Sequence, residues 1–295
     1  MAVAAGSQTQ SRQQQIVRLI RSTDGVELAL HDLGGDGPPL LIVHATGFHA
    51  RCYVPIVGEL SDRFRCWGLD VRGHGASSVP SDWDPDWRAF GDDVEAACDS
   101  IAPEGGIVGF GHSMGGAALL MAAHRLPGRF ERLVLFEPIS HPINEGDTLE
   151  IAQLPLIQGA LRRRRRFDSF GDAYENYRSK PPLSLFVPEA LHEYVQHGFV
   201  EFDDGDGRRV NLVCTPELEA QIFISARQNG VWELLASIIT PTTVIAGQIV
   251  DQQPSEVAER ITDQLPYGEY VSLPHLTHIG PFSHPTEIAN LIALR

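Results

Sequence analysis

The chain has 295 residues, 43% hydrophobic and 21% charged, which is ordinary for a soluble globular protein and excludes a mainly disordered, collagen-like or coiled-coil chain. Acidic residues (38) outnumber basic residues (23), and the net charge of −15 lacks the basic footprint of a nucleic-acid-binding protein. No apolar run approaches the ~18–20 residues that span a bilayer. We therefore expect neither a nucleic-acid partner nor a membrane span.

The start of the chain and the cysteines predict the compartment. Residues 1–15 are polar and rich in Gln and Ser, without the charged and apolar regions of a signal peptide, and we expect a disordered tail there. The four cysteines, Cys52, Cys66, Cys98 and Cys214, show neither CxxC spacing nor the density of a disulfide framework or zinc site. These features predict a cytoplasmic protein.

Short apolar runs alternate with helical patterns along the chain. Bounded by Gly, Pro or charged residues, such runs are typical of buried parallel strands. The predicted strands are Val26–Leu30, Leu40–Val43, Phe64–Leu69, Ile107–Phe110, Leu133–Phe136, Thr243–Ala246 and Tyr270–Leu273. Between them, apolar residues from Trp87 to Ala97 follow a helical stripe, and Ser113–Leu126 is an Ala- and Leu-rich stretch without Pro. The alternation predicts an α/β fold whose mostly parallel sheet has helices on both faces.

The alternation breaks between residues 141 and 237, where the pattern is mostly helical, and resumes afterwards. The resumption favours an α/β core made of residues 16–140 and 238–295, with 141–237 inserted as a helical lid over the carboxyl edge of the sheet. An independent second domain is the alternative.

The strongest local signal is the G-x-S-x-G pattern at residues 111–115. It follows a predicted strand and precedes a predicted helix, so the turn would hold Ser113 in a strained conformation and expose its hydroxyl. The amide of Met114 would then lie at a helix N-terminus, beside that hydroxyl. This context predicts that Ser113 is a nucleophile.

A serine nucleophile needs a base, and the base needs an acid partner. His278 follows the last predicted strand and can lie over the turn at Ser113; His275 is the rival. Asp251 follows the strand Thr243–Ala246 and gives the chain order Ser, Asp, His, while Glu137, at the end of Leu133–Phe136, is the alternative acid.

An oxyanion hole needs a second backbone donor besides the Met114 amide. The strand Leu40–Val43 is followed by residues 44–48, where Ala45 and Gly47 are small enough for close approach of a substrate. We expect the amide of Thr46 to be the second donor, with Gly47 next.

Five ordered motifs resemble the α/β-hydrolase superfamily, in its lidded esterase, lactonase and carbon–carbon-bond hydrolase branch. They are HATGF (44–48), DVRGHGAS (70–77), GHSMGG (111–116), GQIVD (247–251) and THIGPFSHP (277–285). Two positions depart from the family pattern: Ala45 replaces the usual Gly, and Asp251 lies one residue later than the commonest spacing. The resemblance implies an eight-stranded sheet and a Ser-His-Asp mechanism.

Two further segments carry weaker signals. The loop 70–77 follows a predicted strand, and we expect it to brace the turn at Ser113. The arginine run, Arg162–Arg166, cannot face one pocket as a whole, because five successive helical residues surround the helix. We expect a solvated segment there; the alternative is that one or two arginines bind an anionic group of the substrate.

The sequence therefore predicts a serine hydrolase that cleaves a carboxylic ester or lactone of a small molecule through an acyl-enzyme, without metal or cofactor. The alternatives are a carbon–carbon-bond hydrolase of a diketone-type substrate and a ligand-binding protein on the same fold. The substrate and the oligomeric state stay open, a homodimer included.

Overall fold

The computed structural model describes residues 17–142, 155–203, 205, 207–251 and 253–294. The predicted tail, 1–15, lies outside these residues. Eight strands form one sheet in the order β1-β2-β4-β3-β5-β6-β10-β11. Their bounds are β1 Val17–Arg21, β2 Glu27–Gly34, β3 Pro39–Val43, β4 Arg65–Leu69, β5 Ile107–His112, β6 Phe130–Phe136, β10 Thr242–Ala246 and β11 Gly268–Ser272.

The predicted α/β class is confirmed, and the sheet is mixed. The six strands from β4 to β11 are parallel, whereas β2 pairs antiparallel with β4 and β1 antiparallel with β2. All seven predicted strands form, with ends that differ by a few residues. The eighth, β1, was missed because its residues are mostly exposed and give no apolar run.

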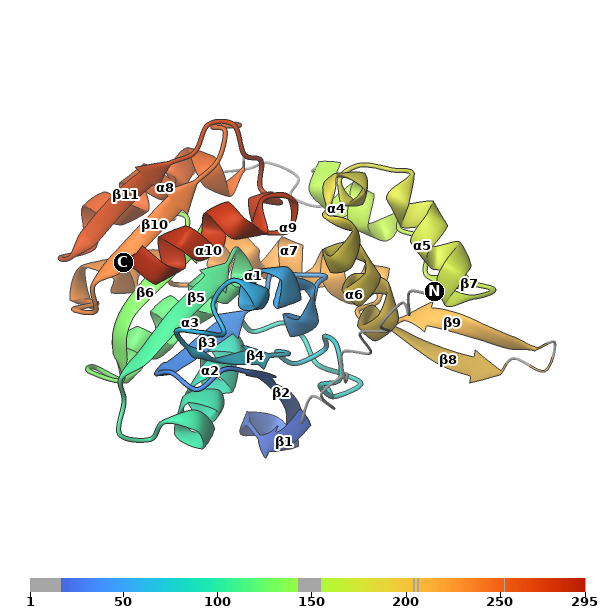
Figure 1. The fold of residues 1–295 in the computed structure, drawn as a ribbon, viewed down its shortest axis with the longest axis horizontal. Helices are drawn as coiled ribbons and strands as arrows, with labels where there is room; N and C mark the ends of the chain where they lie inside the picture. Colours follow the sequence, from blue (N-terminus) through green and yellow to red (C-terminus); the bar gives the residue numbers. More distant parts are fainter. Residues whose placement is uncertain (1–16, 143–154, 204, 206, 252, 295) are drawn as a thin grey trace, which may run out of the picture.

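Helices cover both faces of the sheet (Figure 1). One face packs against α2 (Arg88–Ile101), α3 (Met114–Arg125) and α8 (Pro254–Gln264), and the other against α1 (Val54–Gly58) and α10 (Pro285–Leu294). Successive residues of a strand point to opposite faces, so Leu41 and Val43 of β3 enter the first core while Leu40 and Ile42 enter the second.

Between β6 and β10 lies the inserted segment, residues 155–237. Its described residues form four α-helices and, in addition to the expected helices, a small antiparallel sheet in the order β7-β9-β8 whose hairpin projects from the body (Figure 1). Its elements are α4 Pro155–Leu161, β7 Arg166–Phe167, α5 Phe170–Arg178, α6 Pro188–Gly198, β8 Phe199–Asp203, β9 Arg208–Leu212 and α7 Pro216–Ser225.

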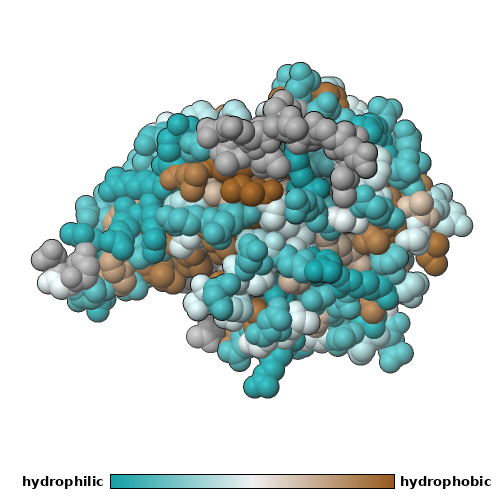
Figure 2. All heavy atoms as spheres, turned by 180° about the vertical axis from the view of Figure 1, so that it is seen from behind, coloured by the Kyte–Doolittle hydropathy of each residue, from teal (hydrophilic) through white to brown (hydrophobic). Residues whose placement is uncertain are grey.

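Aromatic residues join the inserted segment to the core. Tyr177 and Tyr194 belong to the same buried cluster as Phe282 of α9 (Gly280–Ser283). In contrast to this aromatic cluster, the face of the molecule that Figure 2 shows is mostly hydrophilic. Among the described residues, no helix combines the length and apolar character needed to cross a bilayer.

Candidate active site

A sharp turn between β5 and α3 carries Ser113. Its φ of 56° and ψ of −114° lie outside the helical and extended regions, and the residue is 4% exposed. The Ser113 amide donates to the Phe136 carbonyl at 2.9 Å, and the Ser113 carbonyl accepts from the Gly116 amide at 3.0 Å. Backbone bonds on both sides therefore hold a conformation that is unfavourable for a residue with a side chain.

Glycines on either side make this turn possible. A Cβ atom on Gly115 would lie 2.1 Å from the Val43 carbonyl oxygen, and one on Gly111 would lie 2.7 Å from Gly116. No larger residue fits at these two positions without moving backbone. The local sequence around Ser113 thus matches the close packing of β5, β3 and α3.

His278 lies on the loop after β11 with its side chain about one-third exposed. Its Nδ1 is 2.5 Å from Oε2 of Glu137, which follows β6 and is 1% exposed. A carboxylate only accepts, so Nδ1 carries the proton and the Nε2 lone pair is left to act as a base. The other Glu137 oxygen accepts from the Gly247 amide at 2.8 Å, which fixes the carboxylate.

The structure thus brings the alternative acid, Glu137, to the predicted base, and not Asp251. Asp251 is exposed, in the turn before α8. Strands β6 and β10 are neighbours, so both acids leave the same sheet edge. Glu137 turns inward because its φ is +45°, one of three positive values among described non-glycine residues, with Ser113 and Asp24.

The rival base, His275, lies elsewhere. Its Nε2 is 3.0 Å from Oε2 of Glu287 on α10, and its side chain is about half exposed. In the described part of the chain, no hydrogen bond joins the Ser113 hydroxyl to His278. Such contacts are often long without substrate and shorten in the reacting complex.

Residues 44–48, in which the sequence predicts the second backbone donor, are called the oxyanion loop below. The Gly47 amide donates to Nε2 of His74 at 3.1 Å and is therefore occupied. Among the described residues, the amides of Thr46 and Met114 donate to no protein acceptor. Of the two expected candidates, Thr46 is the one whose N–H is available to a substrate oxygen.

The loop 70–77 braces the oxyanion loop as well as the core. His74 donates from Nδ1 to the Arg72 carbonyl at 3.1 Å, which leaves its Nε2 to accept from Gly47. Asp70 accepts from the amides of Ala50 and Ala76. Burial lowers the pKa of His74 from 6.5 to about 4, so the ring stays neutral and can accept.

A buried chain of hydrogen bonds joins the oxyanion loop to the base, and sequence reasoning missed it. The Ala45 amide donates to the Tyr53 hydroxyl (3.2 Å), which lies 2.9 Å from Nδ1 of His112, and Nε2 of His112 is 2.8 Å from the His278 carbonyl oxygen. Since a carbonyl only accepts, His112 carries its proton on Nε2, and Tyr53 donates to Nδ1.

Burial, followed by the nearby His278, lowers the pKa of His112 well below its ordinary value, so this tautomer is neutral. His112 lies within the G-x-S-x-G pattern, but no feature of the sequence indicates its partner Tyr53. The chain of bonds ties the position of the base to that of the oxyanion loop.

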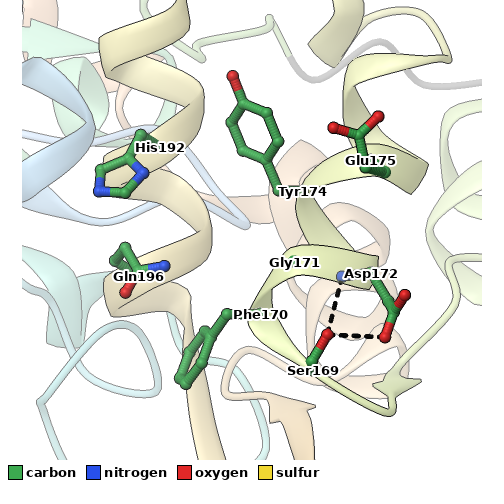
Figure 3. A pocket seen from close by; sticks show the side chains of 8 residues that line it. All are labelled: Ser169, Phe170, Gly171, Asp172, Tyr174, Glu175, His192 and Gln196. Atoms are coloured by element: carbon green, nitrogen blue, oxygen red, sulfur yellow. Dashed lines mark hydrogen bonds between the residues drawn. The ribbon is translucent and has the colours of Figure 1, made fainter.

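A pocket of about 390 Å³ lies away from Ser113, between α5 and α6 (Figure 3). Phe170 and Tyr174 of α5 face His192 and Gln196 of α6 across it, and none of its lining residues belongs to the site above. Among the described residues, no group of three or more His, Cys, Asp or Glu side chains is arranged to hold a metal ion.

Known proteins resemble this chain over different lengths. The probable oxidoreductase EphD of Mycobacterium tuberculosis is 33% identical over 152 residues, 51% of this chain but only 24% of that protein, so the chain spans about a quarter of its length. The pimeloyl-acyl-carrier protein methyl ester esterase of Nitrosospira multiformis is 24% identical over 265 residues, 88% of this chain and 94% of the relative.

The fold agrees with these similarities. The crystal structure of E-2-(acetamidomethylene)succinate hydrolase superposes with a TM-score of 0.78 at 20% identity, covering 95% of this chain and 98% of that one. The model of the alpha/beta hydrolase family matches residues 40–291, which include the turn at Ser113, both acids and His278. The chain belongs to the alpha/beta hydrolase family.

Proposed function

We propose that this protein is a serine hydrolase that cleaves a carboxylic ester or lactone of a small molecule through an acyl-enzyme, with Ser113, His278 and Glu137 as its triad. The observation that carries the proposal is the contact of His278 with Glu137 beside the turn at Ser113, since the ring of His112, the residue before Ser113, lies 4.9 Å from the ring of His278. Ser113 and Glu137 both have strained, positive φ values. Strain of this kind is retained where the surrounding structure requires it, and it clusters at active sites.

In the first half of the reaction, Oγ of Ser113 attacks the substrate carbonyl carbon, and Nε2 of His278 takes the hydroxyl proton. Glu137 stabilises the imidazolium that forms. The carbonyl oxygen becomes an oxyanion and accepts from the amides of Met114 and Thr46, each of which contributes about 3–4 kcal/mol in well-studied enzymes of this type. His278 then protonates the leaving alkoxide as the bond to the acyl carbon breaks.

In the second half, a water molecule gives a proton to His278 and its oxygen attacks the acyl-enzyme carbonyl. Collapse of this second oxyanion breaks the bond to Ser113, whose Oγ takes the proton back from His278. The products are a carboxylic acid and an alcohol, or one hydroxy acid from a lactone.

Turnover on a panel of p-nitrophenyl esters and lactones tests the proposal, together with fluorophosphonate labelling and peptide mass spectrometry. We expect many turnovers per enzyme, a label on the peptide that contains Ser113, and loss of both in Ser113→Ala. A label elsewhere, or tight ligand binding without turnover that survives Ser113→Ala, contradicts the proposal.

A further inference from the structure

An ion pair of the inserted segment lies against the oxyanion loop. Nη2 of Arg163, in the turn after α4, is 3.0 Å from Oε1 of Glu219 on α7. Glu219 is 1% exposed, and the Arg163 side chain is 18% exposed. Both charges are therefore largely removed from water.

The pair contacts the oxyanion loop at Gly47, whose φ is +80°. A Cβ atom on Gly47 would lie 2.4 Å from Oε1 of Glu219 and 3.5 Å from Nη1 of Arg163. Gly47 follows Thr46, whose amide is one of the two donors for the substrate oxygen. Both charged groups thus contact the residue that follows the proposed oxyanion donor.

Aromatic side chains surround this contact. Nη1 of Arg163 also donates to the Tyr194 hydroxyl at 3.1 Å. The Tyr194 ring lies 5.6 Å from the ring of Phe48, and Phe48 lies 4.8 Å from Phe282, near the base. The ion pair thus lies beside aromatic rings, and we call Arg163, Glu219, Tyr194 and Phe48 together the wall.

Three other arginines of the run are directed elsewhere. Arg164 lies over the Phe167 ring at 4.4 Å, Arg166 lies over the Phe202 ring at 5.5 Å, and Arg165 is 4.0 Å from Glu217. All three are exposed. Arg163 is the member of the run that contacts the oxyanion loop, and its charge is matched by a buried carboxylate.

Burial of the Glu219 carboxylate costs free energy. Its Oε2 is buried without a hydrogen-bond partner, and burial raises the pKa of its carboxyl group, while Arg163 acts in the opposite direction. An uncharged side chain of the same shape would pack equally well at this position. It would not lower the stability of the fold either, because a buried ion pair rarely adds stability over an apolar replacement. What only the carboxylate supplies is a charge opposite to that of Arg163.

We propose that the pair of Arg163 and Glu219 keeps this wall electrically neutral, so that the enzyme selects esters with uncharged, apolar acyl groups. An acyl carboxylate beside this pair would lose its hydration next to two charges that cancel, without a net attraction. This inference rests on the proposed ester hydrolysis and names its substrate class. It also reverses the alternative interpretation of the arginine run as a binding site for an anionic group.

The test compares two esters of equal chain length, p-nitrophenyl pentanoate and the p-nitrophenyl monoester of glutaric acid, at pH 7.5. The measured quantity is the ratio of their kcat/KM values, neutral over anionic. We expect a ratio of at least about ten in the wild-type protein. In a variant that leaves one charge of the pair uncompensated, a unit charge about 10 Å from the substrate carboxylate, at an effective dielectric of about 20 to 40, changes this ratio about fourfold to seventeenfold.

Two substitutions should affect the ratio differently. Glu219→Gln leaves the charge of Arg163 uncompensated and should lower the ratio about tenfold, whereas Arg163→Gln removes the positive charge and should not lower it. Glu217→Gln is the matched control, because it removes the same charge from the same helix at a side chain that is 66% exposed. It should change the ratio less than twofold.

The outcomes separate the two proposals. Turnover of both esters with a wild-type preference for the anionic ester, or a ratio unchanged in folded Glu219→Gln, overturns the neutral-wall inference and leaves ester hydrolysis standing. If Glu219→Gln does not fold, the wild-type ratio and Arg163→Gln still decide. Absence of turnover of any ester overturns ester hydrolysis, and the inference with it.

Discussion

Nδ1 of His278 lies 2.5 Å from Oε2 of Glu137, although the two residues are 141 positions apart in the sequence. The acid that meets His278 is therefore the one that follows β6, and not Asp251, which follows β10. The two acids leave adjacent strands of the same edge, and only Glu137 is buried. Substitution of each acid in turn can therefore show which of the two assists His278.

Replacement of Glu137 by Gln should lower kcat about 10³- to 10⁴-fold, because an amide nitrogen facing Nδ1 of His278 favours the tautomer whose Nε2 is already protonated. Asp251→Asn is the control and should stay within about twofold of wild type. Steady-state ester hydrolysis by both purified variants measures the effect. A large loss in Asp251→Asn together with a small loss in Glu137→Gln would restore the acid preferred from the sequence.

Ser113→Gly should be more stable than Ser113→Ala by about 1–2 kcal/mol, although both are inactive. A residue with a Cβ atom is strained at the φ of 56° found here, whereas glycine adopts that conformation freely. Urea unfolding measures the difference in stability between the two variants. Because both variants lack the hydroxyl, its loss does not contribute to that difference. Equal stabilities would mean that the turn at Ser113 stores no strain.

Tyr53→Phe should lower kcat about tenfold and leave KM nearly unchanged, because it removes a link between the oxyanion loop and the base without touching the proposed substrate position. It leaves the Ala45 amide and Nδ1 of His112 without partners and should cost about 1–3 kcal/mol of stability. Ester kinetics and urea unfolding give both quantities. Phe110→Leu, a nearby buried substitution without a polar atom, is the control for packing; a similar loss of kcat in it would contradict the role of the hydroxyl.

The free energy of unfolding should fall as the pH drops from about 6.5 to about 4. Burial lowers the pKa of His74 and of His49 from 6.5 to about 4, so in this window the unfolded chain binds protons that the folded chain does not. Stability therefore rises with pH, by up to about 1.4 kcal/mol per pH unit for each such histidine.

Urea unfolding at pH 7.5, 6 and 5 measures this slope. His49→Gln should lower the slope by about the contribution of one histidine. A wild-type slope of zero across the window would show that these rings are protonated as easily in the folded protein as in the unfolded chain.

Local sequence determined the parts of the molecule in which neighbouring residues set the geometry. The apolar runs predicted seven of the eight strands of the large sheet, and the strand, glycines and helix around Ser113 predicted the strained turn. Each of these features depends on contacts within a few residues or on the packing of small side chains.

Only the tertiary structure decided which distant groups meet. Glu137 and Asp251 both follow strands in the sequence, and the choice between them depends on how β6 turns at its end and on the Gly247 amide, 110 residues away. The partner of Arg163 likewise lies far along the chain, on α7 of the inserted segment. Hydrogen bonds and ion pairs act over a few ångströms in space, and the separation of two residues along the chain does not fix that distance until the sheet and the inserted segment have packed.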